Sequence, residues 1–223
     1  MSNVNAAKLI IENIQLLEQA VKLLERELAE VFFKTVDEVI KKSVNDFEDE
    51  TIAIYDLYEN DTWFLSAKWK REPFNINDDK THKNLFAYYQ ILSHDFGEDG
   101  NYWWLTNFFI NNYGLIVFGF YLHRDGFNKT YAKDWKAFIA EMNQNYPQIE
   151  QLGFKFDTEG WYLPIASLDS DEVVKNYEND TLEDALTPIT EALNTLKQAH
   201  PYFDQIVQAA IAKFGRVEVE EIV

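Results

Sequence analysis

The sequence predicts an α+β fold in which a long N-terminal helix and C-terminal helices pack together beside a mainly antiparallel sheet built from hairpins. Three observations support this prediction: an apolar heptad pattern near the N-terminus, paired β-rich runs in the centre, and helical periodicity in the C-terminal third. The order of elements is helix, strands, helix, strands, helices, which is typical of α+β proteins. We expect residues 1–47, 48–168 and 169–223 to form these three parts of one cooperative domain.

The first element is a long helix from about Val4 to about Val44, because no Gly or Pro interrupts this stretch. Apolar residues recur at the spacing of a coiled coil, with Ile10, Leu17, Leu24 and Val31 in one register and Ile14, Val21 and Leu28 in the other. A second stripe widens this face and favours packing against more than one element: Leu9, Leu16 and Leu23. The β-branched and aromatic run 31–36 is the expected position of a kink.

The partner of this helix is predicted to lie in the same chain. We expect Leu17, Val21 and Leu24 to dock on the amphipathic helices of Asp171–Phe214, which are present at a high effective concentration. A parallel self-dimer would bring the acidic excess of this helix against itself, so a homo-oligomer through the N-terminal helix is the less favoured alternative.

The central region contains three pairs of β-rich runs, each flanking a polar turn. The pairs are Ile52–Tyr58 with Trp63–Trp69, Tyr102–Ile110 with Leu115–Leu122, and Phe154–Phe156 with Trp161–Leu163. The second pair is apolar at nearly every position, which predicts a central hairpin covered on both faces. Between the first two pairs, Leu85, Tyr88, Tyr89 and Leu92 recur at helical spacing and favour a helix over Lys83–His94.

The remaining elements are predicted to be helical. Thr130–Asn145 carries an apolar face, and Thr181 followed by Asp184 matches a capping box at the start of a helix. Pro188 should kink this helix or begin a new one, and His200-Pro201 should open a further helix that ends near Phe214.

Charge and composition limit the function. The chain of 223 residues has 38 acidic and 20 basic residues, a net charge of −18 and no cysteine. Such a surface repels nucleic acid and anionic membranes and attracts cations or a basic protein. The absence of cysteine excludes disulfides, thiolate zinc sites and a cysteine nucleophile. Without an apolar signal segment or a membrane-spanning run, we expect a cytoplasmic protein that contacts no membrane.

No motif for catalysis or cofactor binding is present. The sequence has no glycine-rich phosphate loop, no Gly-x-Ser-x-Gly elbow and no His-Glu-x-x-His pair. The four histidines are not spaced as a local metal site, so we expect no metal and no cofactor: His82, His94, His123 and His200. His123 ends a predicted central strand, and with Asp125 it is the candidate for acid–base catalysis.

The candidates for binding a partner are acidic and aromatic residues on half-exposed strands and their flanks: Asp46, Glu48, Asp49, Glu50, Tyr55, Tyr58, Asp61, Trp63 and Trp69. They favour a non-enzymatic protein that docks on the basic surface of a partner, such as an inhibitor, immunity protein or nucleic-acid mimic acting on a nucleic-acid enzyme. Direct nucleic-acid binding is not expected. The alternatives are a metal-dependent hydrolase or nuclease-like enzyme without a readable signature, and a subunit of a larger assembly held through the N-terminal helix.

Overall fold

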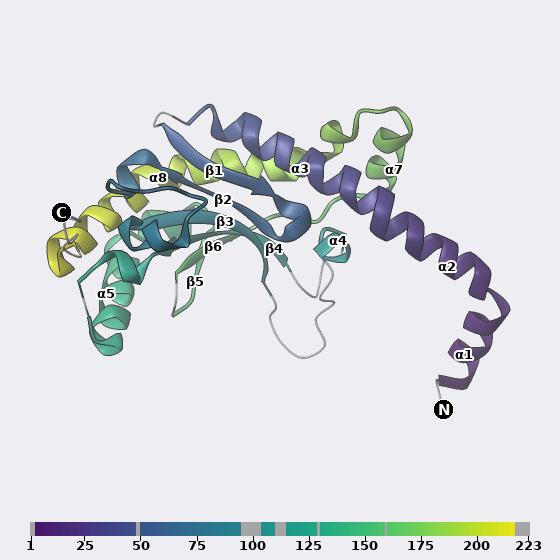
Figure 1. Ribbon diagram of the computed structural model, residues 1–223, viewed down its shortest axis with the longest axis horizontal. Helices are drawn as coiled ribbons and strands as arrows, with labels where there is room; N and C mark the ends of the chain where they lie inside the picture. The colour runs from purple at the N-terminus through teal and green to yellow at the C-terminus, as the bar shows by residue number, and fades with distance from the viewer. Residues whose placement is uncertain are drawn as a thin grey trace.

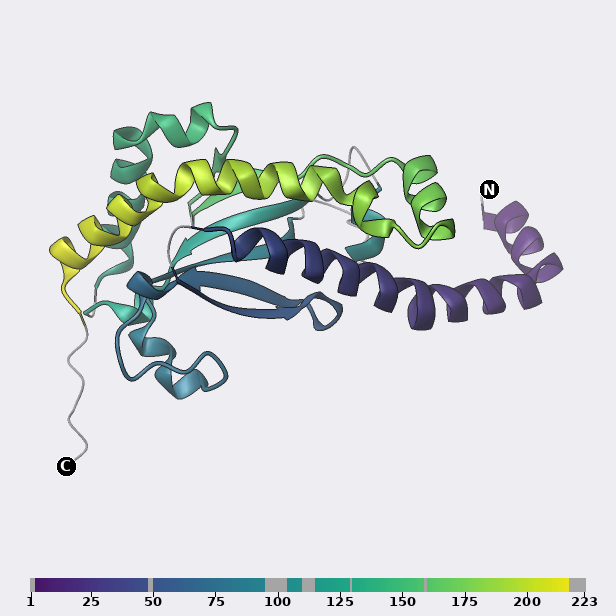
Figure 2. The same ribbon diagram turned by 90° about the horizontal axis from the view of Figure 1, so that it is seen from above.

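The computed structural model describes residues 3–47, 50–94, 104–109, 115–128, 130–158 and 160–216. Two long helices, α3 (Ala29–Val44) and α8 (Thr187–Phe214), lie side by side across one face of an antiparallel sheet (Figures 1 and 2). This is the α+β arrangement that the sequence predicts, with the C-terminal helices packed against the N-terminal one. No helix among the residues described is long and apolar enough to cross a membrane.

The described part of the sheet has six strands in the order β1-β2-β3-β4-β6-β5, and every neighbouring pair is antiparallel. The strands are β1 (Thr51–Asp56), β2 (Asp61–Ser66), β3 (Ala87–His94), β4 (Leu115–Leu122), β5 (Lys155–Phe156) and β6 (Trp161–Pro164). The β1–β2 and β5–β6 hairpins confirm two of the three predicted pairs. Asn60 closes the first hairpin with a φ of 60°, a conformation that Asn adopts more readily than most residues.

Two central elements differ from the prediction. Ala87–His94 is strand β3, which pairs with β4 along eight residue pairs, and not a helix. Trp104–Asn107 forms the short helix α4, so the predicted strand over Tyr102–Ile110 is wrong in its described part. The central strand β4 pairs with β3 and β6 instead. Both errors have one cause, because a run that is apolar on all sides does not reveal whether its period is that of a strand or a helix.

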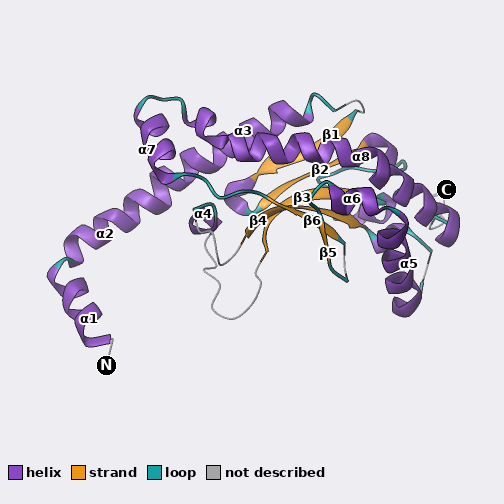
Figure 3. Cartoon of the chain, turned by 180° about the vertical axis from the view of Figure 1, so that it is seen from behind, coloured by secondary structure: helices purple, strands orange, loops and turns teal. Residues whose placement is uncertain are grey.

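The N-terminal helix is divided into segments. α1 (Asn3–Glu12) and α2 (Ile14–Leu23) meet at a break at Asn13, and a π-helical turn, Leu24–Leu28, leads into α3. α3 continues through residues 31–36, so the predicted kink there is wrong. Figure 3 shows α1 and α2 extending away from the sheet as an arm.

Of the three α-helices in this N-terminal stretch, only α3 has buried residues among those described. Its buried apolar residues are Ala29, Phe32, Phe33, Val36, Ile40 and Val44. In the arm, by contrast, the side chains of Leu17 and Val21 are 41% and 47% exposed. The prediction that these two residues dock on the C-terminal helices of the same chain is therefore wrong, although Leu24 is partly buried against the core.

The other helices are α5 (Ala132–Asn145), α6 (Pro147–Gln151), α7 (Ser170–Glu178) and a 3-10 turn at Leu182–Leu186 before α8. Pro188 lies in the first turn of α8 and marks its start. Pro201 is inside α8, where it is exposed, and it starts no new helix. The predicted capping box is also wrong, because the Thr181 hydroxyl bonds to Asn176 Oδ1 at 2.9 Å.

The core lies between the sheet and the α3–α8 layer. Phe120 of β4 stacks on Phe203 of α8 with ring centroids 4.1 Å apart, and Tyr89 of β3 bonds through its hydroxyl to His200 Nδ1 of α8 at 2.9 Å. Because side chains alternate along a strand, the neighbours of these residues on β3 and β4 point to the opposite face of the sheet. That face carries the first candidate site.

Candidate functional site

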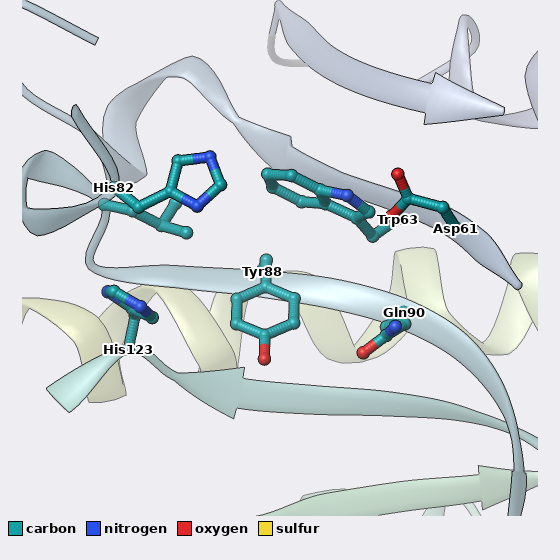
Figure 4. A pocket seen from close by; sticks show the side chains of 7 residues that line it. Asp61, Trp63, His82, Tyr88, Gln90 and His123 are labelled. Carbon is teal, nitrogen blue, oxygen red and sulfur yellow. The ribbon is translucent and has the colours of Figure 1, made fainter. Parts of the chain in front are cut away.

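A pocket of about 200 Å³ opens on the face of the sheet that points away from α8. Its lining residues come from β2, β3, a 3-10 helix and the end of β4: Asp61, Trp63, His82, Leu85, Tyr88, Gln90 and His123. Figure 4 shows the rings of His82 and Trp63 along one side, with His123, Tyr88 and Gln90 along the other. We call this hollow the His123 pocket.

Strand register and two 3-10 turns assemble the His123 pocket. Trp63 of β2 pairs with Gln90 of β3, which places both side chains on the same face. His82 comes from the 3-10 helix Asp79–Asn84, which packs against the turn Arg124–Gly126 that follows His123. This contact requires glycine, because a Cβ atom at Gly126 would lie 1.9 Å from the carbonyl oxygen of Leu85.

His123 has an unusual environment. Its Nδ1 atom is buried and has no hydrogen-bond partner among the residues described. Burial lowers the pKa of the imidazole below its usual value of 6.5, and His82 lowers it slightly more. The charge of Asp125 and a hydrogen bond to the Leu85 backbone oppose this shift without reversing it. The lowered pKa favours the neutral form of the ring, and its unpartnered nitrogen can accept a hydrogen bond or a proton.

The rest of the pocket combines the aromatic rings of Trp63, His82 and Tyr88 with Asp61, Leu85 and Gln90. Among the described residues, no hydrogen bond joins His123 Nδ1 to a second catalytic group. The Trp63 ring meets His82 and Tyr88 edge-on, with centroids 5.8 and 5.7 Å apart. His82 is engaged with the Ile76 carbonyl at 3.2 Å. Asp125 lies on the exposed turn beside the pocket, so it affects His123 through its charge. Over the described part of the chain, no group of three or more His, Asp or Glu residues can hold a metal ion.

A second candidate site surrounds the solvent side of α3. One groove of about 690 Å³ lies between α3 and β1, and its lining residues are Glu30, Lys34, Asp37, Glu38, Lys41, Tyr55, Asp56 and Tyr58. A groove of about 510 Å³ lies between α3 and α8, with charged lining residues Glu38, Lys42, Asp46, Glu183 and Asp184. Glu38 lines both grooves, so they form one continuous surface, which we call the α3 face.

The α3 face is acidic and includes a structural carboxylate. Of the lining residues described, seven are acidic and three are basic. Asp37 is buried and accepts hydrogen bonds from the Leu57 N–H at 2.8 Å and the Thr62 hydroxyl at 2.6 Å. Burial and, to a smaller extent, the charge of Asp56 raise the pKa of Asp37 more than these two hydrogen bonds lower it. Burial and the charge of Asp37 together raise the pKa of Tyr55 to about 12.

The predicted partner-binding residues do not form a single patch. Asp46, Tyr55 and Tyr58 lie on the α3 face, whereas Asp61 and Trp63 line the His123 pocket. Glu50, which lies between Asp46 and Tyr55 in the sequence, is exposed. Glu48 and Asp49 lie outside the described residues. Trp69 is fully buried and its Nε1 donates to Asp204 of α8 at 3.0 Å, so its assignment as a surface residue is wrong.

Tyr88 and Gln90 were not identified from the sequence as pocket residues. The acids of α3 were also not identified as candidates for binding a partner. A period of two along β3 would have placed Tyr88 and Gln90 on one face. The acids of α3 occur at helical spacing, but the partners that turn them into a groove, β1 and the turn 182–186, are distant in sequence.

No protein-family model, curated protein or solved structure matches this chain. What the two sites do is therefore inferred from their geometry and chemistry.

Proposed function

We propose that this protein is a non-enzymatic binding protein that docks on a basic surface of a protein partner through its α3 face. The observation that carries the proposal is the joining of two grooves at Glu38 into a surface with seven acidic and three basic residues. A concave surface with an excess of one charge concentrates its field and speeds the association of an oppositely charged partner.

The aromatic residues of the α3 face suit the same role. Tyr58 is 48% exposed, and its hydroxyl donates to the Glu25 carbonyl at 3.2 Å, which holds the ring in place. Tyr55 lies beside it along the α3–β1 groove. Fixed tyrosines surrounded by acids are favourable contacts for arginine and lysine side chains. A nucleic-acid enzyme with a basic groove fits this description, so an inhibitor, immunity protein or nucleic-acid mimic is the class we propose.

The test compares two triple variants with equal loss of charge. Glu38→Gln, Glu183→Gln and Asp184→Asn together remove three of the seven acidic residues of the α3 face and leave four acids against three bases. Asp134→Asn, Glu150→Gln and Glu178→Gln remove three exposed acids elsewhere. Each protein is immobilised and used to capture proteins from the native host at several salt concentrations. We expect basic proteins to bind the wild type and the control, and to be lost from the α3-face variant and at high salt.

A set of captured proteins that is identical for all three baits would overturn the proposal. Retention that is insensitive to salt would contradict its electrostatic basis.

The His123 pocket supports one alternative, acid–base chemistry on a small substrate. The specific observation is the buried Nδ1 of His123, which has no hydrogen-bond partner among the described residues and lies in a pocket with aromatic walls. A ligand-observed NMR screen of small metabolites tests this alternative. The alternative predicts that at least one compound binds the wild type and does not bind a Trp63→Ala variant. A screen that finds no such compound would contradict it.

A further inference from the structure

The N-terminal arm, residues 3–23, carries nine of the fourteen large hydrophobic side chains that are exposed among the described residues. Large side chains between 41% and 74% exposed occur throughout its described residues: Val4, Leu9, Ile10, Ile11, Ile14, Leu16, Leu17, Val21 and Leu23. Figures 1 and 2 show α1 and α2 extending beyond the sheet. A contiguous apolar surface of this kind marks an interaction site in a soluble protein.

The π-helical turn aligns the apolar face of α2 with the buried face of α3. The N–H of Ala29 bonds to the Leu24 carbonyl five residues earlier, so the turn contains one residue more than an α-helical turn. In an uninterrupted α-helix, the buried face of α3 would continue back onto Glu25, Lys22 and Glu18. The extra residue rotates the apolar face of α2 into line with the buried face of α3 instead.

Leu24 and Leu28 are accordingly partly buried against the core. The apolar seam of the arm therefore continues the buried face of α3. Along the arm, however, no other part of the described chain covers this seam.

The residue types in this seam favour a second, similar helix as the partner that covers it. In heptad terms, β-branched Ile14 and Val21 occupy the a positions, and Leu17 occupies the d position between them. This combination favours two parallel strands.

Charge supports the parallel orientation. In a parallel pair, position g of one helix faces position e of the other, so Asn13 would face Glu18 of the second copy and Ala20 would face Glu25. Neither contact joins like charges. In an antiparallel pair, the e positions of the two helices face each other. Glu18 and Glu25 would then lie against the same glutamates of the second copy. Glu18 and Glu25 therefore oppose an antiparallel pair and leave the parallel one without a direct charge clash.

We propose that the arm pairs in parallel with the arm of a second copy of this chain, through Ile14, Leu17 and Val21. The proposal does not rest on the proposed function, because none of the residues 3–23 lines the α3 face. The seam between the break at Asn13 and the body is short, so we expect a dimer that dissociates on dilution.

Sedimentation of the full chain over a range of concentrations tests the pairing. The wild type should shift from monomer to dimer as its concentration rises, whereas a Leu17→Gln, Val21→Gln variant should remain monomeric. The control is Leu9→Gln, Leu16→Gln, which removes two exposed apolar residues of the second stripe and should still dimerise. Circular dichroism confirms that each variant is folded. A wild type that is monomeric throughout, or two variants that behave alike, would overturn the proposal.

The cysteine-free chain also allows the orientation to be tested. In a parallel pair, a Leu17→Cys residue faces its own copy within disulfide reach, whereas Gln19→Cys lies on the outer side of the helix. Mild oxidation should therefore cross-link the first variant and not the second. An antiparallel pair would place Leu17 against Ile14 or Val21 of the second copy, so equal or absent cross-linking of the two variants would contradict the parallel arrangement.

Discussion

The hydroxyl of Thr62 donates a hydrogen bond of 2.6 Å to the buried carboxylate of Asp37, and this bond fastens the β1–β2 hairpin to α3. The second carboxylate oxygen of Asp37 accepts from the Leu57 N–H, and the Thr62 hydroxyl oxygen accepts from the Asp56 N–H at 3.0 Å. The hairpin carries residues of both candidate sites, since Tyr58 lines the α3–β1 groove and Asp61 lines the His123 pocket. One buried carboxylate therefore positions both.

Replacing Asp37 should be costly. Asp37→Ala leaves the Leu57 N–H and the Thr62 hydroxyl without this acceptor in a buried setting, so we expect the free energy of unfolding to fall by about 1–3 kcal/mol. Urea denaturation measures the change. The neighbouring residue Glu38 is exposed, and Glu38→Ala should stay within about 0.5 kcal/mol of the wild type. Equal effects of the two substitutions would show that the Asp37 bonds contribute nothing to stability.

His123 should make the stability depend on pH. Its pKa is lower in the folded protein than the usual 6.5, so just below that value the unfolded chain binds a proton that the folded protein does not. Stability contributed by His123 is therefore present above this window and is lost as the pH falls through it. We expect wild-type stability to fall relative to that of His123→Gln between about pH 7.5 and about pH 5.5. A difference between the two proteins that stays constant over this range would contradict the lowered pKa.

Gly126 should be required for the shape of the His123 pocket. A Cβ atom at this position would overlap the Leu85 carbonyl oxygen, so Gly126→Ala must push the turn Arg124–Gly126 away from the 3-10 helix that carries His82. We expect a loss of about 1–3 kcal/mol in stability, together with shifted imidazole NMR signals of both histidines.

The matched control for Gly126 is Asp125→Ala, in the same turn. Asp125 is exposed, so its substitution should change stability by no more than about 0.5 kcal/mol. Unshifted signals for His82 in Gly126→Ala would mean that the close approach to Leu85 does not determine the pocket.

The elements that could be predicted from the sequence are those whose signal is local. Asn60 and its neighbours indicate the turn of the β1–β2 hairpin, and the apolar run Leu115–Leu122 indicates a buried strand. β3 could not be distinguished from a helix, because Tyr89 faces the core and Tyr88 is also half-buried on the opposite face. When both faces of a strand are covered, the alternation that identifies it is weak.

The candidate sites depend on contacts that no local pattern contains. Trp63 and His123 line one pocket only because β2, β3 and β4 are adjacent in the sheet. The exposure of Leu17 could not be predicted from the sequence either. An apolar heptad pattern predicts that its seam is covered but does not say whether the same chain or a second one covers it.

Phe118 should be among the most costly residues to truncate. It is fully buried in β4, opposite Ile91 of β3 on one side and Leu163 of β6 on the other. Phe118→Ala removes most of a ring from a site closed on both flanks by paired strands, so the cavity cannot easily collapse. We expect a loss of about 3–5 kcal/mol. The control is Tyr131→Ala, which removes an aromatic ring that is 83% exposed and should leave the denaturation midpoint unchanged. If the two midpoints were equal, β4 would not be the centre of the sheet's core.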